Sequence, residues 1–470
     1  MNEFWAKFYT AVVRNPQKRR YICDILTNKT DLQQAIEATK LAQTSKPARL
    51  SFSELQNFEK NAKGVCFGCL DTKLQAQNAY KVLQLKAKVK AGEKIKVGFY
   101  IIEDNAFPFK SLFELMLQEE IFDPYVVICV TNGDSEFRAA EGQVAKLSAV
   151  WGERVLRGYD PEVKEPIDIA KNFDLIATSQ PYEEIWHKFY TIKRAVSTGA
   201  LVLFTGYAMG TASWNRDRIV TKPALNLCWR VFVDTHYGLK EYQTLTLNRG
   251  KNAFLTGYVK MDQLAKITPQ IRARKRVIIA PHHTIAVQYN SALQLSNFFR
   301  YSEFFFTLFE KYPQIDFIFR PHPLLLTALR KPEYWGEQKA EAYFARFKAV
   351  KNAVFENRGE YYESFVNSDG IIHDCGSFIG EYLYTDHPCC YMLKEEQMNE
   401  KNLAEFGKEC INHYYHAYDE AGIERFLDEV VLAGRDLKKE ARVKFANEVV
   451  KVNYPHAAKV ALELVKRQFV

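Results

Sequence analysis

The sequence predicts an α/β protein made of two tandem units, each with a parallel sheet covered by helices. Three observations support this prediction. The chain has 470 residues, which is too long for one ordinary hydrophobic core. Short apolar runs rich in Val, Ile and Phe alternate with helical patterns along most of its length. A basic, polar stretch at 267–276, ITPQIRARKR, separates one set of alternating runs from the next.

The first unit is expected over residues 93–266. Its opening strand is the run KIKVGFYII, and helical patterns such as 109–119 lie between the runs. Strands that alternate with helices in this way form parallel sheets. The strand-like runs lie at 94–102, 124–130, 173–177, 201–204 and 253–256.

The second unit is expected over residues 272–400, followed by a helical tail over 401–470. Helical segments at 295–312 and 376–385 separate its apolar runs. Two such units in tandem are typical of an enzyme with its active site in a cleft. The strand-like runs lie at 276–280, 316–320, 370–374 and 388–392.

Residues 1–92 are expected to form a basic helical extension. Residues 1–95 hold 17 Lys and Arg against 8 Asp and Glu, whereas the whole chain carries a formal net charge of +8. A basic segment on a nearly neutral body is typical of contact with an anionic membrane surface, a polyanionic polymer or nucleic acid, the last being the least expected here. Within it, an apolar helical stripe either packs on the body or lies in a membrane interface. The stripe is Phe4, Trp5, Phe8 and Tyr9.

The sequence indicates a cytoplasmic protein. No stretch approaches 18 uncharged apolar residues, which a membrane-spanning helix requires. The N-terminal basic cluster follows the apolar residues, the reverse of the order in a secretory signal. With the basic extension, these features also fit peripheral attachment to the inner face of the cytoplasmic membrane.

Three strands of the second unit end in loops rich in polar side chains. In a parallel sheet, ligands bind beyond the carboxyl ends of the strands, so we expect these loops to line one crevice. The loops read PHHT after the first strand, RPHP after the second and DCGS before a helix. The candidate residues are His282, His283, Arg320, His322, Asp374, Gly376 and Ser377.

The residue types in these loops suit a phosphate-bearing substrate. Gly376 and Ser377 open a helix, where free N–H groups favour an anion. Arg320 offers a forked pair of donors for phosphate oxygens, and two prolines hold His322 in a rigid backbone. A histidine also suits proton transfer near neutral pH.

Each loop also has an interpretation without a ligand. The pair His282 and His283 could bind a metal ion or simply pack in the loop. Arg320 could be salt-bridged inside a rigid turn. Asp374 and Ser377 could cap the following helix, which would satisfy the same N–H groups.

Four segments together resemble the CDP-glycerol glycerophosphotransferase family, the teichoic-acid-type and capsule-type transferases. They are TGYVKMD at 256–262, IIAPHHT at 278–284, FRPHP at 319–323 and DGIIHDCGSFIGEYLYTDHP at 369–388. The resemblance covers roughly residues 95–395. It implies a GT-B fold, with two Rossmann-like domains facing a cleft, the first on the acceptor side and the second holding the nucleotide donor. The implied reaction transfers glycerol phosphate from CDP-glycerol, or another CDP-polyol, to a hydroxyl of a cell-envelope glycan or polymer and releases CMP.

The resemblance also implies roles for individual residues of the donor site. Arg320 and His322 match an element that contacts the donor diphosphate. Gly376 and Ser377, with the adjoining Phe378, match a helix start that holds phosphate. One further position, Glu381, matches an acidic residue that faces the polyol or ribose hydroxyls of the donor.

One departure from the family lies after the last strand of the first unit. Teichoic-type members have a catalytic His-Gly-Thr element there, and this sequence has Thr205, Gly206 and Tyr207 instead. Members without that histidine often carry a Pro-His-His segment in the second domain, as this chain does. We therefore expect His283 to be the general base, with His282 as its substitute and the Thr205–Tyr207 segment on the acceptor side.

The sequence leaves two other functions open. One is a GT-B glycosyltransferase that uses a nucleotide sugar, and the other is a catalytically inactive, polymer-binding protein of the same fold. No DxD motif is present, so no resident metal or cofactor is expected, although assistance by Mg²⁺ stays open.

Overall fold

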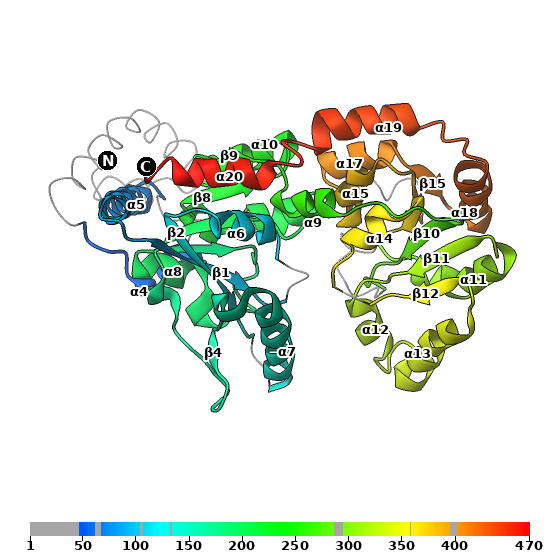
Figure 1. Ribbon diagram of the computed structural model, residues 1–470, viewed down its shortest axis with the longest axis horizontal. Helices are drawn as coiled ribbons and strands as arrows, with labels where there is room; N and C mark the ends of the chain where they lie inside the picture. Colours follow the sequence, from blue (N-terminus) through cyan, green and yellow to red (C-terminus); the bar gives the residue numbers. More distant parts are fainter. Residues whose placement is uncertain are drawn as a thin grey trace.

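The computed structural model describes residues 47–61, 67–103, 107–131, 134–285, 295–357, 359–394 and 402–470. Two parallel sheets, of seven and six strands, form separate halves of the molecule (Figure 1). The predicted class, an α/β protein with two helix-covered parallel sheets, is confirmed. The predicted N-terminal stripe lies outside the described residues.

The first sheet has the order β3-β2-β1-β6-β7-β8-β9, and all its pairs are parallel. The chain runs outward from β1 to β3 and then returns to the other side of β1 at β6. This reversal makes the carboxyl ends of β1 and β6 the place where an open α/β sheet binds ligands. The strands are β1 (Ile95–Ile101), β2 (Phe122–Ile128), β3 (Val155–Arg157), β6 (Leu175–Thr178), β7 (Leu201–Thr205), β8 (Arg230–Val233) and β9 (Ala253–Leu255).

The second sheet repeats this plan in the order β12-β11-β10-β13-β14-β15. Its reversal lies between β10 and β13, where Val277 is opposite Gly370 in a parallel register. The PHHT and DCGS segments follow these two strands directly, so the fold brings them together. The strands are β10 (Lys275–Ala280), β11 (Ile315–Phe319), β12 (Ala353–Phe355), β13 (Gly370–His373), β14 (Cys389–Met392) and β15 (Tyr415–Ala417).

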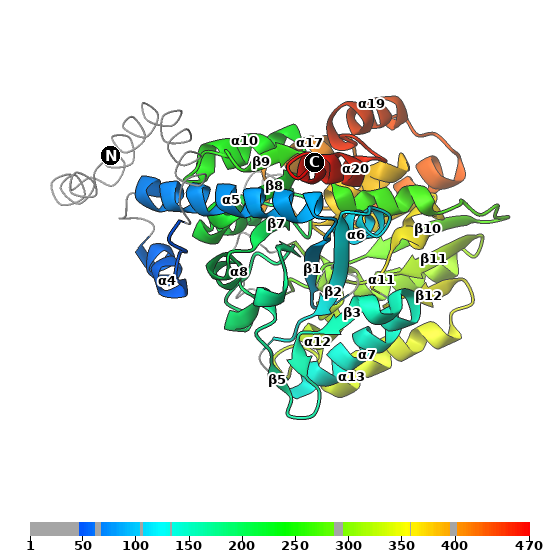
Figure 2. The ribbon, with the colours of Figure 1, turned by 60° about the vertical axis from the view of Figure 1, so that its left-hand side comes forward.

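Helices flank both sheets, and two short strands, β4 (Tyr159–Asp160) and β5 (Glu165–Pro166), form a separate hairpin. The long helix α5 lies along the first sheet (Figure 2). The first half has α4 (Phe52–Asn61), α5 (Phe67–Lys90), α6 (Lys110–Met116), α7 (Asp134–Trp151), α8 (Ile192–Thr198), α9 (Ser213–Asn215) and α10 (His236–Leu245). The remaining helices are α11 (Phe298–Lys311), α12 (Leu324–Leu329), α13 (Gly336–Ala345), α14 (Tyr362–Val366), α15 (Phe378–Glu381), α17 (Glu405–Asn412), α18 (Glu420–Arg425), α19 (Lys439–Phe445) and α20 (Ala457–Lys466).

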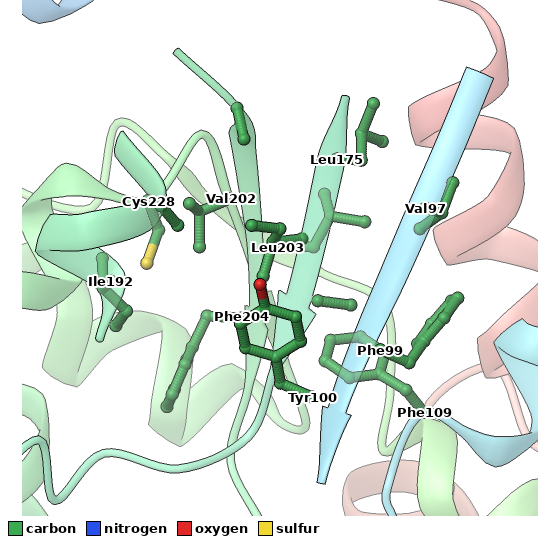
Figure 3. Packing of buried hydrophobic residues seen from close by; sticks show 14 of the residues in the cluster. Val97, Phe99, Tyr100, Phe109, Leu175, Ile192, Val202, Leu203, Phe204 and Cys228 are labelled. Atoms are coloured by element: carbon green, nitrogen blue, oxygen red, sulfur yellow. The ribbon is translucent and has the colours of Figure 1, made fainter. Parts of the chain in front are cut away.

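The central strands are apolar on both faces because helices cover both faces of each sheet. Figure 3 shows this packing in the first half, with Phe99 and Phe109 side by side near Tyr100. β7 is buried at every position from Leu201 to Thr205. Such continuous burial is why these strands read as unbroken apolar runs in the sequence.

The C-terminal segment is shared between the two halves. α20 returns to the first half and packs beside α6, as the red helix in Figure 1 shows. The carboxylate of Asp262 accepts the backbone N–H groups of Ala457 and Ala458, at 3.3 and 2.7 Å, and so caps the start of this helix. The structure differs from the prediction of a wholly helical tail at β15, which pairs with β14.

None of the helices within the described ranges combines the length and apolar character that crossing a bilayer requires.

Candidate active site

A cavity of about 470 Å³ lies between the two halves, at the carboxyl ends of both sheets. Its second-half wall comes from the loops after β10, β11 and β13, as the sequence predicts. Its first-half wall comes from the ends of β1, β6 and β7. The polar and aromatic lining residues are Tyr100, Ser179, Gln180, Tyr182, Trp186, Tyr207, Thr211, Trp214, Asn215, His282, His283, Thr284, His322 and Ser377.

Three histidines form a compact cluster in the second-half wall. The ring of His283 lies 4.3 Å from that of His282 and 4.1 Å from that of His322, measured between centroids. The backbone N–H of His322 donates to the carbonyl of Pro281 at 2.9 Å, which ties the two loops together. The sheet thus joins three imidazoles that are separated by up to 40 positions in the chain.

Hydrogen bonds from the backbone fix the proton position on two of these rings. The N–H of Leu324 donates to Nδ1 of His322 at 3.1 Å. A backbone N–H can only donate, so a neutral His322 carries its proton on Nε2. Nδ1 of His282 accepts from the N–H of Thr284 at 3.4 Å and lies 2.8 Å from the Thr284 hydroxyl. The same tautomer follows for His282, so both rings can donate from Nε2.

Burial keeps all three imidazoles neutral. It lowers the pKa of His283 to about 4 and that of His322 to about 3. Burial, and then the neighbouring imidazoles, lower the pKa of His282 well below its usual value. An anion bound here would favour the protonated rings and raise these pKa values. The cluster can therefore gain positive charge when an anion binds.

The cluster also has the spacing of a metal site, since one nitrogen from each ring lies within 4.8 Å of the others. A histidine that binds a metal ion normally donates its second N–H to an acceptor. In His322 the second nitrogen instead accepts a hydrogen bond from Leu324. This arrangement fits donation to an anion better than coordination of a cation.

The loop after β13 contributes Gly376 and Ser377 to the cavity. Asp374, in the same loop, is fully buried and does not line it. Its carboxylate accepts the backbone N–H groups of His282 at 2.7 Å and Asn297 at 2.5 Å, and burial raises its pKa to about 6. Asp374 therefore holds the histidine loop against β13, and a direct contact with the donor stays a prediction.

Arg320, the first residue of the loop after β11, is buried. Its guanidinium donates to the Glu356 carboxylate at 2.7 Å and to the Gly359 carbonyl at 2.8 Å, and the side chain is 5% exposed. This is the salt-bridged arrangement that the sequence left as an alternative. Arg320 does not line the cavity, and a contact with phosphate stays a prediction.

Glu381 is also fully buried, and a network of hydrogen bonds surrounds it. One carboxylate oxygen accepts from Lys260 Nζ at 3.2 Å and from the Tyr258 hydroxyl at 3.3 Å, and the other accepts from the Tyr361 hydroxyl at 2.5 Å. Phe378 packs on Tyr361, with ring centroids 5.1 Å apart, and neither it nor Glu381 lines the cavity. A contact of either residue with the donor stays a prediction.

Of the three acceptor-side candidates, Tyr207 lines the cavity, whereas Thr205 and Gly206 do not. Thr205 is buried in β7 and donates to the carbonyl of Phe232 at 3.2 Å. The Tyr207 hydroxyl lies 3.2 Å from the Tyr182 hydroxyl, and burial raises the pKa of Tyr207. Tyr207 is therefore a neutral phenol in the first-half wall of the cavity, and its place on the acceptor side stays a prediction.

Most of this aromatic wall was not predicted from the sequence. Tyr100 is the last residue but one of β1, Tyr182 and Trp186 follow β6, and Trp214 follows β7. The available signal was their position, because each lies at or after the carboxyl end of a central strand in the first sheet.

No protein-family model and no curated protein matches the sequence. Solved structures match its fold. A variant of the wall teichoic acid polymerase TagF, soaked with CDPG, has a TM-score of 0.52 at 11% identity over 89% of this chain and 97% of that chain. Another TagF structure has a TM-score of 0.50 at 12% identity over the same shares.

The UDP-GlcNAc 2-epimerase from Neisseria meningitidis, bound to UDP-GlcNAc, has a TM-score of 0.50 at 15% identity over 80% of this chain and 100% of that chain. Identities this low show a shared fold and leave the function to the site itself. The chain has a GT-B-like two-domain fold, as the polymerase and the epimerase do.

Proposed function

We propose that the protein transfers glycerol phosphate, or a related polyol phosphate, from a CDP-activated donor to a hydroxyl of a cell-envelope glycan or polymer. The observation that carries the proposal is the meeting of His282, His283 and His322 with Gly376 and Ser377 on one wall of the interdomain cavity. These groups offer N–H and O–H donors to the oxygens of a diphosphate. The TagF structure soaked with CDPG supports a donor of this kind on the same fold.

In this proposal, an acceptor hydroxyl attacks the β-phosphorus of the donor. The new O–P bond forms as the bond between that phosphorus and the bridging oxygen of CMP breaks. Donation from Nε2 of His282 and His322 stabilises the negative charge on the phosphate oxygens. Positioning and charge stabilisation supply most of the acceleration in reactions of this type.

His283 is the general base of the proposed reaction. Its Nδ1 is buried without a hydrogen-bond partner among the described residues, and its low pKa keeps the ring unprotonated at neutral pH. The donor diphosphate raises that pKa, so the base becomes stronger when the donor is bound. A base of this kind contributes roughly 10²–10⁴-fold to the rate.

Nucleotide release tests the proposal directly. The purified protein is incubated with CDP-glycerol, CDP-ribitol or a UDP-sugar, together with a glycan acceptor, and the released nucleotide is identified by chromatography. CMP release that depends on both acceptor and a CDP-polyol supports the proposal. UDP release from a UDP-sugar would instead establish a glycosyltransferase, which the absence of a His-Gly-Thr element at Thr205–Tyr207 favours as the second candidate. Failure to bind any nucleotide would leave the inactive, polymer-binding alternative.

We propose that the reaction takes place at the inner face of the cytoplasmic membrane, with the basic N-terminal 95 residues as the contact. Several lysines in the described part of this segment have partners inside the protein. Lys81 and Lys88 each lie 2.8 Å from the carboxylate of Asp174, and Lys73 lies 3.2 Å from that of Glu54. Lys86 and Lys90 are exposed on α5 and remain candidates for an anionic surface.

A further inference from the structure

The first-half wall of the cavity holds a buried polar atom without a partner among the described residues. The Trp186 indole N–H forms no hydrogen bond with them, although the side chain is only 6% exposed, and Trp186 lines the cavity. The Tyr100 hydroxyl also has no partner in the described part of the chain, but it points back along the sheet, away from the carboxyl ends of the strands (Figure 3). Leaving a buried donor unsatisfied costs about 1–3 kcal/mol, which a ligand can recover by supplying the partner. This wall therefore has a polar group that a ligand can satisfy.

The rest of the wall is aromatic and already hydrogen-bonded. The Trp214 indole donates to the Tyr182 hydroxyl at 3.2 Å, and that hydroxyl lies 3.2 Å from the hydroxyl of Tyr207. Only one of the two hydroxyl hydrogens can lie between the tyrosines, so the other is left for a further acceptor. Aromatic faces with hydroxyl and N–H groups at their edges suit a sugar ring, which has apolar C–H faces and a rim of hydroxyls.

The two walls differ in the charge that they can carry. Among the described residues that line the cavity, none is Lys, Arg, Asp or Glu. The imidazoles of the second wall can take up protons when an anion binds. Phenols and indoles cannot, and burial raises the pKa of Tyr100 well above its usual value, which keeps it neutral. The first wall therefore has no means of neutralising a phosphate.

Two cations contact this wall without lining the cavity. Lys222 lies 5.2 Å from the Tyr182 ring centroid, and its ammonium donates to the Glu184 carboxylate at 2.7 Å. Arg218 lies over the Trp214 ring at 4.6 Å. A growing polyol-phosphate chain would place anionic groups along the wall, and the lining offers them no cationic partner.

We infer that the first-half wall binds the acceptor, and that the acceptor's reacting end is an uncharged sugar ring and not a polyol phosphate. This inference rests on the proposed function and specifies its acceptor. Trp186 contacts a hydroxyl of the sugar, and the rings of Tyr182, Tyr207 and Trp214 pack on its faces. The ring presents a hydroxyl toward His283 and the donor phosphate on the opposite wall.

Direct binding tests the inference without requiring catalysis. The protein is titrated with methyl glucoside, methyl galactoside and methyl N-acetylglucosaminide, and separately with an oligo(glycerol phosphate), while tryptophan fluorescence is recorded at low and high salt. We expect saturable binding of at least one glycoside, with an affinity that salt leaves unchanged. Binding of the oligo(glycerol phosphate) alone, or tighter binding of it that salt weakens, would overturn the inference.

Variants locate the binding. Trp186→Phe removes the unpartnered indole N–H and keeps an aromatic ring. We expect it to weaken glycoside binding about three- to tenfold, the value of one neutral hydrogen bond. Trp151→Phe, in the same half but outside the cavity, is the matched control and should leave the affinity unchanged. CMP affinity, measured by calorimetry, should stay the same in Trp186→Phe.

Each remaining outcome separates the two proposals. A loss of CMP affinity in Trp186→Phe would place the nucleotide base on this wall and overturn the inference. If glycosides bind but no acceptor supports CMP release from CDP-glycerol, the proposed function fails while the sugar site stands. If CMP release requires an oligo(glycerol phosphate) and no glycoside binds, the proposed function stands and the inference fails.

Discussion

The hydroxyl of Thr211, in the first half, donates a hydrogen bond of 2.6 Å to the backbone carbonyl of Gly376 in the second half. The Thr211 carbonyl accepts the N–H of Ala404 at 2.9 Å, and a Cβ built on Gly407 would lie 2.0 Å from that carbonyl oxygen. The loop after β7 is thus seated on the segment that begins the proposed phosphate site. The two walls of the cavity therefore meet at this contact.

Substitutions of His322 test which of its nitrogens acts on the donor. His322→Ala should lower the turnover of CMP release about 10²–10³-fold, because a positioned N–H donor is lost. Gln places its amide nitrogen near Nε2 and should recover part of this loss. Asn places its amide nitrogen near Nδ1 and should not. Equal turnover in the two amide variants would contradict the assignment of the donor to Nε2.

Acid should destabilise the protein through its buried histidines. The folded-state pKa values of His283 and His322, about 4 and 3, lie below the unfolded value of about 6.5. As pH falls below 6.5, the unfolded chain takes up protons that the folded protein excludes. The free energy of unfolding therefore decreases as the pH is lowered through this window. Each such group contributes a slope of about 1.4 kcal/mol per pH unit.

The measurement is chemical unfolding between pH 6.5 and 4.5. His283→Gln should reduce the slope of the unfolding free energy against pH by about 1.4 kcal/mol per pH unit, the contribution of one proton. His236→Gln, which replaces an exposed histidine at the start of α10, is the control. The same slope in the wild type and in His283→Gln would show that the unprotonated, buried His283 does not contribute to this acid sensitivity.

Ser377 and Arg320 should separate ligand binding from stability. Ser377→Ala removes a hydroxyl that lines the cavity and should weaken CMP binding several-fold, with an unfolding free energy within about 0.5 kcal/mol of the parent. Arg320→Ala leaves Glu356 without its ion-pair partner and should cost about 3–5 kcal/mol of stability. Calorimetry with CMP and denaturant titration give the two readouts. If Arg320→Ala lost CMP affinity at unchanged stability, Arg320 would be a phosphate ligand.

The pair Lys260 and Glu381 should couple the two walls. Lys260 Nζ lies 3.4 Å from the Tyr207 carbonyl and 3.2 Å from Glu381, so it joins the loop after β7 to α15. Lys260→Met should destabilise the protein by about 3–5 kcal/mol because it leaves the buried carboxylate of Glu381 without its ion-pair partner. The double variant Lys260→Met with Glu381→Gln should recover much of that loss. If Glu381→Gln alone changed the preference between CDP-glycerol and CDP-ribitol, Glu381 would contact the polyol.

The exposed lysines of α5 should contribute to attachment to anionic vesicles. Lys86→Glu with Lys90→Glu should weaken sedimentation with such vesicles, by roughly 1 kcal/mol for each lost positive charge, and high salt should weaken it in the parent. Lys81→Glu is not a matched test, because it would break the pair with Asp174. No binding of the parent to anionic vesicles would contradict the proposed attachment.

The fold was predictable because fully buried parallel strands leave unbroken apolar runs. The strands missing from the prediction are short or lie toward the sheet edges, where the apolar signal is weak. β12, for example, has one buried residue in three, and β15 is three residues long. β8 was missed although three of its four residues are buried. Its run RVFV follows Trp229 without a turn signal.

The site was only partly predictable, for a different reason. Chain order indicates which loops leave adjacent strands, and that was enough to bring the histidines together. It does not show which way a side chain points, so it could not reveal that Arg320 and Glu381 are both buried in ion pairs. Nor does it show that the indole N–H of Trp186 lacks a partner among the described residues, which only the packed structure reveals.

The return of α20 to the first half means that the chain crosses between the halves twice, and the two crossings touch. Gly257, with φ of +84°, lies on one crossing, and a Cβ built on it would meet the Val452 carbonyl on the other at 1.9 Å. Asn453 donates to the Thr256 carbonyl at 3.1 Å. Two adjacent connections oppose twisting of one half against the other, and they permit rotation of the halves about one line. Opening of the cleft to admit a polymer end is therefore expected to be a swing about the Gly257–Val452 contact.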